Sequence, residues 1–195
     1  SKVVLNSYAA IKKEIDELER INKFHLEKEG LHKDAKEKEA KLNEATVIQI
    51  ASLITKINSR MAEINSKYYL NETMSPILAT PSTKKYTFAT PNDQGTGCKF
   101  KGMITLDAAV LTTTPLPAIA HDSVMFVQMS YERVERTMRL YSQINDKQIF
   151  IAVDRTTSLN MEAQEIINTH RRLLLSPGGN ELFGWYWGKP KEDKQ

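Results

Sequence analysis

Residues 116–123 read LPAIAHDS, a short apolar run bounded by prolines that leads directly into an acidic residue and a hydroxyl. A run of this length next to proline predicts a short buried strand. Two roles are open for Asp122, which follows the strand. It can lie at the carboxyl end of a strand in an open α/β sheet, where such folds bind their ligands. Alternatively, it only caps the segment that comes next, which is a common use of Asp at this position.

The segments around this strand alternate in type. Residues 98–111 and 130–144 carry apolar side chains at helical spacing, and Ser130 is the expected N-cap of the second helix. Residues 147–154 (KQIFIAVD) form a second apolar run that again ends in Asp, and residues 160–170 predict a third helix. The order strand, helix, strand, helix predicts parallel pairing in an α/β layer.

Further strands are expected on both sides of this layer. Residues 84–89 alternate apolar and polar side chains as a strand does. Residues 171–176 (RRLLLS) and 182–187 (LFGWYW) predict a closing pair of strands across a Pro-Gly-Gly turn.

Residues 1–69 differ in composition from the rest of the chain, since they contain one glycine and no proline. Apolar residues recur there at alternating spacings of three and four, which is the pattern of a coiled coil. The members of this seam are Ile11, Ile15, Leu18, Val47, Ile50, Ile54, Ile57, Met61, Ile64 and Tyr68. The sequence therefore predicts a coiled-coil arm over residues 1–69 and an α/β domain over residues 70–195.

A charged segment, residues 27–44, separates the two parts of the seam. It forms either the exposed tip of an antiparallel helical hairpin or the middle of one long helix whose partner lies elsewhere. Ile15, Ile50 and Ile57 share one heptad column, which tolerates a continuous helix. No apolar seam crosses the charged segment, however, and Gly30 weakens a helix. These two points favour a break near residues 28–44.

The whole chain has 195 residues, of which 41% are hydrophobic and 26% charged, and its net charge is +3. This composition predicts a folded protein, and its charge is too balanced to indicate nucleic-acid binding by itself. Cys98 is the single cysteine, so no disulfide can form within the chain. No apolar run is long enough to span a bilayer, and no signal peptide opens the chain. These features favour a cytoplasmic protein without a membrane partner.

A glycine loop, residues 94–97 (QGTG), opens the helix expected over residues 98–111. Glycine lets backbone amides approach an anion, and the helix N-terminus adds partial positive charge. Lys99 and Lys101 follow in the first turn, where cations oppose the helix dipole unless a phosphate is bound. The alternative is a simple turn with solvent-exposed lysines, and the loop taken alone favours this second interpretation.

Other catalytic chemistry has little support in the sequence. His121 lies beside Asp122, and its place at the end of an apolar strand favours a packing role over a catalytic one. One cysteine and scattered histidines give no metal-ligand spacing. A P-loop requires G-x-x-x-x-G-K-[ST], and the only Gly-Lys pair, Gly188 and Lys189, is followed by proline.

The order of these pieces resembles the C-terminal lobe of the SMC-like ABC ATPase heads used in chromosome maintenance and double-strand-break repair. The segments GTGCKFKGMITLDAAVL (95–111), LPAIAHDS and KQIFIAVD look more closely like an uncharacterised bacterial family of SMC-like ATPases, some of them linked to antiphage defence. The resemblance covers roughly residues 68–187. It implies half of an ABC-type ATPase head, with parallel strands and flanking helices, preceded by a coiled-coil arm.

The resemblance also implies roles for individual residues. Asp122 matches the Walker B aspartate, which holds the Mg²⁺ that bridges the phosphates of ATP. Gly95, Thr96 and Gly97 match the ABC signature loop, which contacts the γ-phosphate of a nucleotide bound to the opposing head. Lys99, in the first turn of the following helix, is the further candidate for contact with that phosphate.

Two positions depart from the family's pattern. Ser123 stands where ABC ATPases have a glutamate, and a serine hydroxyl is a poor base at neutral pH. Asp154 stands in the place of the switch histidine, and the signature serine is absent from its usual place. Residues 124–130 match the D-loop, which lines the interface between heads. The resemblance therefore implies catalytic roles for Asp122, Ser123 and Asp154, with either slow hydrolysis or another carboxylate as the base.

The resulting prediction is the C-terminal half of an SMC-like ATPase that couples ATP-driven head dimerisation to coiled-coil arms in DNA maintenance, repair or antiphage defence. It requires ATP, Mg²⁺ and an N-terminal P-loop lobe outside this sequence, so ATP hydrolysis by these 195 residues alone is not expected. Its expected partners are a second copy of the head, DNA and accessory proteins.

A different class of function also fits the sequence. Ser123 and Asp154 favour a non-catalytic coiled-coil module that binds another protein. DNA binding along the arm is a third alternative, but the glutamates between its lysines favour a solvated face instead. The lysines concerned are Lys12, Lys13, Lys36, Lys38 and Lys41.

Overall fold

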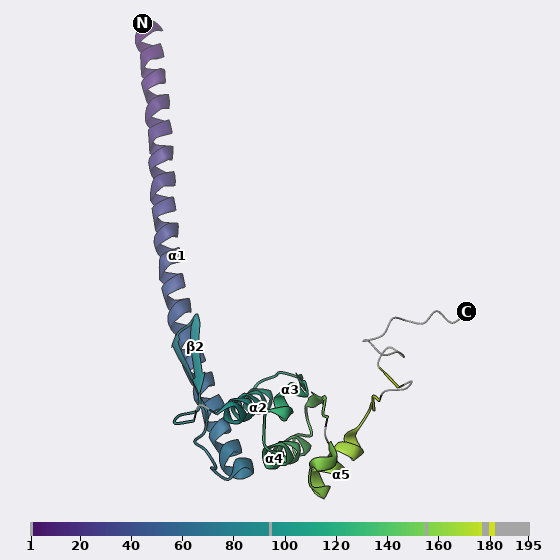
Figure 1. Ribbon diagram of the computed structural model, residues 1–195. Coiled ribbons are helices and arrows are strands. Elements are labelled where there is room, and N and C mark those ends of the chain that lie inside the picture. The colour runs from purple at the N-terminus through teal and green to yellow at the C-terminus, as the bar shows by residue number, and fades with distance from the viewer. Residues whose placement is uncertain (1, 94, 155, 177–179, 182–195) are drawn as a thin grey trace, which may run out of the picture. The chain divides into compact units, whose positions relative to one another are not determined.

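The computed structural model describes residues 2–93, 95–154, 156–176 and 180–181. Its first element is α1 (Lys2–Tyr69), a helix of 68 residues (Figure 1). Oppositely charged side chains about one turn apart stabilise its solvated surface. The Lys41 ammonium lies 2.7 Å from the Glu37 carboxylate, and the Arg20 guanidinium lies 3.2 Å from the Glu17 carboxylate.

The expected break in the charged segment is wrong, because α1 continues through residues 28–44. Gly30 lies inside the helix, with no atom within 4 Å of the position that a Cβ would take. A single exposed glycine costs a helix only about 1 kcal/mol relative to alanine. The neighbouring residues are mostly glutamate, lysine and alanine, which are good helix formers, and they offset this cost.

The end of α1 and the hairpin that follows are fixed by backbone geometry and one asparagine. Leu70 and Asn71 have φ values of 55° and 54°, the left-handed conformation that terminates many helices. Strands β1 (Ile77–Ser82) and β2 (Lys85–Ala89) then pair in a two-stranded sheet. The Asn58 amide of α1 donates to the Leu78 carbonyl over 2.8 Å and accepts from the Leu78 N–H over 2.9 Å.

The rest of the fold alternates helices and strands as expected. The elements are α2 (Thr96–Thr113), β3 (Ala118–His121), α3 (Val124–Val127), α4 (Tyr131–Ser142), β4 (Gln148–Ile151), the 3-10 helix η1 (Thr156–Ser158) and α5 (Met161–His170). β3 and β4 pair in parallel, with Ala118 opposite Gln148 and His121 opposite Ile151. This confirms the predicted parallel pairing. The described residues are therefore mostly helical, with two small sheets.

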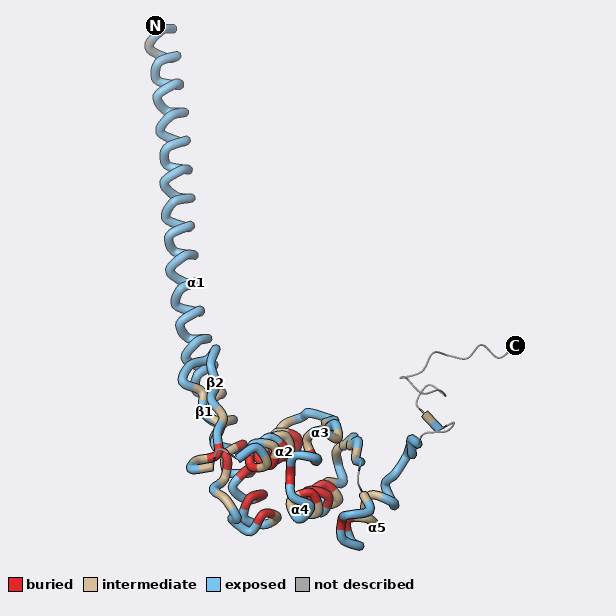
Figure 2. The backbone as a smooth tube through the Cα atoms, in the orientation of Figure 1, coloured by how far each residue is buried: buried red, intermediate tan, exposed pale blue. Residues whose placement is uncertain are grey.

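The hydrophobic core combines α2, α4 and the C-terminal part of α1. Met61 and Ile64 of the predicted seam are fully buried there, beside Ile104 of α2 and Met138 of α4. The N-terminal part of the seam is exposed instead, as the pale blue of α1 in Figure 2 shows. Its members there include Ile11, Ile15, Leu18 and Val47, which are 58%, 50%, 57% and 53% exposed.

The chain divides into two compact units, Ser1–Leu53 with Thr80–Lys85 and Ile54–Ala79 with Tyr86–Gln195. The first is helical apart from the hairpin residues, and the second holds the parallel sheet, its helices and the core. The division at residue 69 stays a prediction. Of the expected closing strands, residues 171–175 have no regular structure and Ser176 forms an isolated bridge with Asn180, whereas residues 182–187 lie outside the described part of the chain.

Candidate functional site

The carboxyl edge of the parallel sheet carries both candidate aspartates. Asp122 directly follows β3, and Asp154 comes three residues after the end of β4. The Ala152 N–H donates to the His121 carbonyl over 3.0 Å, so the pairing of the two segments extends to the last residue of β3. Both aspartates are exposed. They leave the sheet at the same edge, which is where open α/β sheets bind ligands.

The Asp122 carboxylate takes part in the turn between β3 and α3. Its Oδ1 accepts from the Ser123 N–H over 2.7 Å, and the Asp122 carbonyl accepts from the Met125 N–H over 3.2 Å. Ser123 is the N-cap residue of α3, but its hydroxyl makes no capping hydrogen bond. One carboxylate oxygen of Asp122 thus supports the turn, while the residue remains exposed to solvent. The two roles considered from the sequence are compatible.

The glycine loop forms the entrance to α2. Gly95 is the N-cap residue, with extended φ and ψ values of −60° and 140°, and its N–H donates to Asp93 Oδ1 over 2.9 Å. That hydrogen bond lowers the pKa of Asp93. Thr96 and Lys99 are exposed in the first turn of α2. The loop therefore presents a hydroxyl and an ammonium group to solvent beside the positive end of an 18-residue helix.

Gly97 brings this loop against the segment that follows α3. A Cβ at position 97 would lie 3.0 Å from the Gln128 carbonyl oxygen and 3.3 Å from Arg133 Nη1. Such approaches are closer than ordinary van der Waals contact, so a larger residue would push the two segments apart. The structure thus joins the loop at residues 95–97 to residues 124–130. None of the hydrogen bonds between described residues links Asp122 to Gly95, Thr96 or Gly97.

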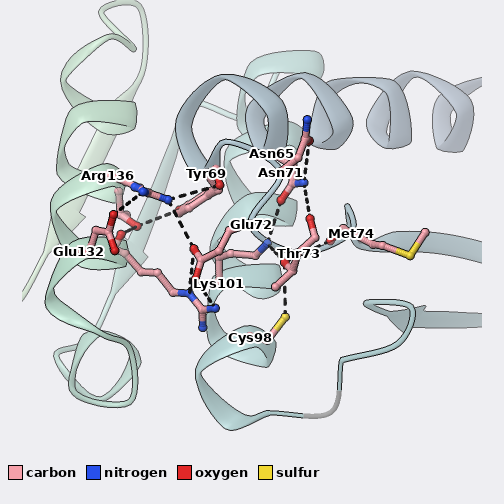
Figure 3. A network of polar contacts seen from close by, with 12 residues as sticks. Asn65, Tyr69, Asn71, Glu72, Thr73, Met74, Cys98, Lys101, Glu132 and Arg136 are labelled. Atoms are coloured by element: carbon pink, nitrogen blue, oxygen red, sulfur yellow. Dashed lines mark hydrogen bonds and ion pairs between the residues drawn. The ribbon is translucent and has the colours of Figure 1, made fainter.

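Lys101 departs from the expectation, because it is buried rather than directed at a phosphate or at solvent. Its ammonium donates to Asn65 Oδ1 over 2.8 Å and to the Thr73 hydroxyl (Figure 3). The ring of Tyr69 lies 5.3 Å from the same nitrogen. Burial lowers the pKa of Lys101 and raises that of Tyr69 to about 12. This lysine therefore joins α2 to the end of α1 and is not available to a nucleotide.

A second set of contacts joins the end of α1 to α4. Glu72, just after α1, accepts from Arg133 Nη2 over 2.8 Å and lies 3.4 Å from Arg136 Nη1 (Figure 3). The hydrogen bond from Arg133 lowers the pKa of Glu72. The Tyr69 hydroxyl lies 2.9 Å from the Thr137 hydroxyl of α4. Together with Lys101, these contacts form the coil-root network, which consists of Asn65, Tyr69, Glu72, Thr73, Lys101, Arg133, Arg136 and Thr137.

His121 is buried, which supports the packing role expected from the sequence. Its Nε2 lies 2.7 Å from the Tyr141 hydroxyl, and its Nδ1 lies 3.2 Å from Met125 Sδ and 3.9 Å from Asp107 Oδ2. Burial lowers the pKa of His121 and raises those of Asp107 and Tyr141.

Sequence reasoning identified the loop and the strand ends but missed the coil-root network. Asn65 and Thr73 lie 36 and 28 residues before Lys101, so no local pattern joins them. One signal was available. A lysine expected in the first turn of a helix would oppose the helix dipole. In the structure Lys101 is the sixth residue of α2, and its ammonium lies at the end of α1, where the dipole favours a cation.

The described residues hold no group of three or more His, Cys, Asp or Glu side chains placed to bind a metal ion. In the described part of the chain, no helix has the length and apolar character needed to cross a membrane.

Comparison with known proteins assigns the chain to a family. No curated protein matches the sequence. Among solved structures, a chain from a study of ATP-driven dimerisation and DNA-stimulated activation of SMC ATPases matches with a TM-score of 0.50 and 14% identity. The match covers 69% of this chain and 84% of that one, which supports an α/β fold like that of an SMC ATPase head. A family model described as "Uncharacterised protein conserved in bacteria (DUF2326)" matches residues 61–187, and the chain belongs to this bacterial family.

Proposed function

We propose that this chain is the C-terminal half of an SMC-like ATPase head with the root of its coiled-coil arm. The observation that carries the proposal is the parallel pairing of β3 and β4, from which Asp122 and Asp154 leave the sheet at one edge. The glycine loop that opens α2 and the likeness to an SMC ATPase head support the same assignment. An N-terminal P-loop lobe outside these residues would complete the head.

The residues at the sheet edge fit Mg²⁺ bound together with ATP. Mg²⁺ prefers oxygen ligands and is usually held by one or two carboxylates, several waters and the phosphates of the substrate. Asp122 is exposed and supplies one carboxylate, of which Oδ1 accepts from the Ser123 N–H. When bound, the metal neutralises charge that develops on the phosphates.

The candidate residues of this chain then form two faces, one at the edge of the parallel sheet and one at the glycine loop, and each face binds a different nucleotide. Asp122 holds the metal–nucleotide on its own head, and Ser123 and Asp154 lie beside it at the same edge. Thr96, Gly97 and Lys99 present backbone amides, a hydroxyl and an ammonium to the γ-phosphate of a nucleotide on a second head, and Gly95, whose N–H is bonded to Asp93, opens the loop. A homodimer of heads is the simplest arrangement that uses both faces, because none of the hydrogen bonds between described residues links Asp122 to the glycine loop.

Hydrolysis by this site is expected to be slow. Ser123 occupies the place of a general base, and its hydroxyl is a poor base at neutral pH. Asp154 is a carboxylate at the same edge and is the candidate that orients the attacking water. Binding and closure of the heads do not depend on this step, so we propose that ATP binding is the main event that the arm transmits.

The biological setting is proposed from the same likeness. The matched SMC ATPase structure comes from work on DNA-stimulated activation. We therefore propose a role in DNA maintenance, repair or antiphage defence in the cytoplasm, with DNA and accessory proteins as partners of the arm.

Mg²⁺-dependent binding of ATP tests the proposal directly. In the complete protein, including its P-loop lobe, Asp122→Ala should weaken the Mg²⁺-dependent part of ATP affinity by about 10- to 100-fold, the range of a lost charge-assisted contact. The matched control is Asp146→Ala, an exposed aspartate before the amino end of β4. Titration of a fluorescent ATP analogue with and without Mg²⁺ measures both. Equal Mg²⁺ dependence in the two variants would show that Asp122 serves only the turn.

A non-catalytic interaction module is the second candidate, and one observation favours it. The seam of α1 leaves Ile11, Ile15 and Leu18 at least half exposed, as a helix that binds a partner helix does. In that case neither the Asp122→Ala substitution nor Mg²⁺ would alter ATP binding. The complete protein would also self-associate equally with and without ATP.

A further inference from the structure

His121 occupies the position directly before the candidate metal ligand. It is the last residue of β3, and only 5% of its surface is exposed. A residue buried at the end of a strand is more often apolar than histidine. A buried imidazole there must instead have both ring nitrogens satisfied, because an unpaired buried polar group is costly.

Each ring nitrogen of His121 contacts a different helix. Nδ1 lies 3.2 Å from Met125 Sδ in α3, and Nε2 lies 2.7 Å from the Tyr141 hydroxyl in α4. A thioether sulfur can only accept a hydrogen bond. Nδ1 therefore carries the proton, and Nε2 accepts from the Tyr141 O–H. The ring also lies nearly parallel to that of Tyr141, at 5° with centroids 5.6 Å apart, and meets Phe126 of α3 edge-on.

The backbone of the same residue is held from the other side. The His121 carbonyl accepts from the Ala152 N–H over 3.0 Å, which fixes it to the segment after β4. Residue 121 is thus attached to β4 through its backbone and to α3 and α4 through its side chain. Asp122 and Ser123 lie between His121 and α3, so the imidazole fixes both ends of the turn that carries the Asp122 carboxylate.

We propose that His121 is a positioning residue, which with Tyr141 holds the Asp122 carboxylate in the orientation that binds the Mg²⁺ of Mg²⁺–ATP. This inference rests on the proposed function. Neither His121 nor Tyr141 touches the metal or the nucleotide. Their effect is therefore on the Mg²⁺-dependent part of ATP affinity and not on binding of ATP without the metal.

The test compares two buried tyrosine hydroxyls in the complete protein. Tyr141→Phe removes the hydroxyl that bonds His121, whereas Tyr69→Phe removes the one that bonds Thr137, which is hydrogen-bonded to no residue of β3 in the described structure. ATP affinity with and without Mg²⁺ and the midpoint of thermal unfolding are measured for both. Tyr141→Phe should lower the Mg²⁺-dependent part of ATP affinity by about 2- to 10-fold, and Tyr69→Phe should lower only the thermal midpoint.

Two further variants at residue 121 sharpen the result. His121→Phe keeps a ring but loses both nitrogens, and it should reproduce or exceed the effect of Tyr141→Phe. His121→Gln offers Oε1 as an acceptor for the Tyr141 hydroxyl, so it should recover part of the Mg²⁺ dependence.

The outcomes separate this inference from the proposed function. If Asp122→Ala abolishes the Mg²⁺ dependence but Tyr141→Phe and His121→Phe change only the thermal midpoint, His121 is a packing residue and the inference is wrong. If Asp122→Ala itself leaves the Mg²⁺ dependence intact, the proposed function fails and this inference fails with it.

Discussion

Lys101 is a buried ammonium group that forms no ion pair with a carboxylate among the described residues. Its hydrogen bonds go to neutral oxygens, Asn65 Oδ1 at 2.8 Å and the Thr73 hydroxyl. It also lies at the C-terminal end of α1, where unsatisfied carbonyl groups give partial negative charge. A buried cation can persist in such a place because acceptors and the dipole offset part of its desolvation.

Removing this ammonium should destabilise the fold. Lys101→Met keeps most of the side-chain volume but leaves Asn65 Oδ1 without the ammonium donor and Thr73 Oγ1 with only the Cys98 thiol, 3.9 Å away. Each unsatisfied buried group costs about 1–3 kcal/mol, and relief of the buried charge offsets part of that, so we expect a net loss of about 1–3 kcal/mol. Urea unfolding of the 195-residue chain measures it. Lys99→Met, at an exposed position of the same helix, is the control and should change stability by less than about 0.5 kcal/mol. Equal effects would contradict the role given to Lys101.

At the scale of elements, the sequence predicted those parts whose signals are local. The sequence predicts five elements within a few residues of their observed bounds: the helices α2, α4 and α5 and the strands β3 and β4. The spacing of apolar residues and the flanking prolines indicate them. The one-turn helix α3 and the 3-10 helix η1 were not expected, since three or four residues carry no period. The break expected in the charged segment of α1 was wrong. Without an apolar seam this segment has no surface for packing against a partner helix, but its residues still have high helix propensity.

The same limit applies to the candidate site. The glycine loop and the strand-end aspartates could be located because each follows from one element's end. The burial of Lys101 and the bond between His121 and Tyr141 could not, because they depend on how separate elements pack. Pairs separated by 20 or more residues leave no periodic signal in the sequence.

The link between the end of α1 and α4 should make stability depend on acid pH. Hydrogen bonding from Arg133 holds the pKa of Glu72 below the ordinary value of a glutamate. A carboxyl with a lowered pKa in the folded state adds stability at neutral pH, and this is lost as the pH falls below about 4.5. Glu72→Gln should therefore be less stable than the wild type at pH 7, and the two should converge in acid. Urea unfolding across this range checks it. Glu63→Gln, whose pair with Arg60 is more exposed, is the control, and the same convergence in that variant would argue against a specific role of Glu72.

At the scale of the whole molecule, the proposed site is divided between two copies of the head. Asp122 of one copy and the glycine loop of the other would meet on the same nucleotide. Thr96→Glu should impair phosphate binding by the loop without destabilising the fold. Thr96 is exposed at the first position of α2, where the helix dipole favours a carboxylate. The variant should stay folded while its charge repels the γ-phosphate. Thr96→Gln is the uncharged control.

This division predicts complementation between two inactive variants. Asp122→Ala alone and Thr96→Glu alone should each fail to dimerise with Mg²⁺–ATP, because every site in such a dimer carries one defect. In a mixed dimer both defects fall in one site, and the other site is intact. Since neither variant pairs with itself, the dimers that form in an equal mixture are mixed ones with one intact site of two, so the mixture should recover at most about half of the wild-type sites. Analytical ultracentrifugation of the complete protein with Mg²⁺–ATP measures the recovered dimer. A mixture that dimerises no better than either variant would place Asp122 and Thr96 in the same half of the site and contradict the two-head arrangement.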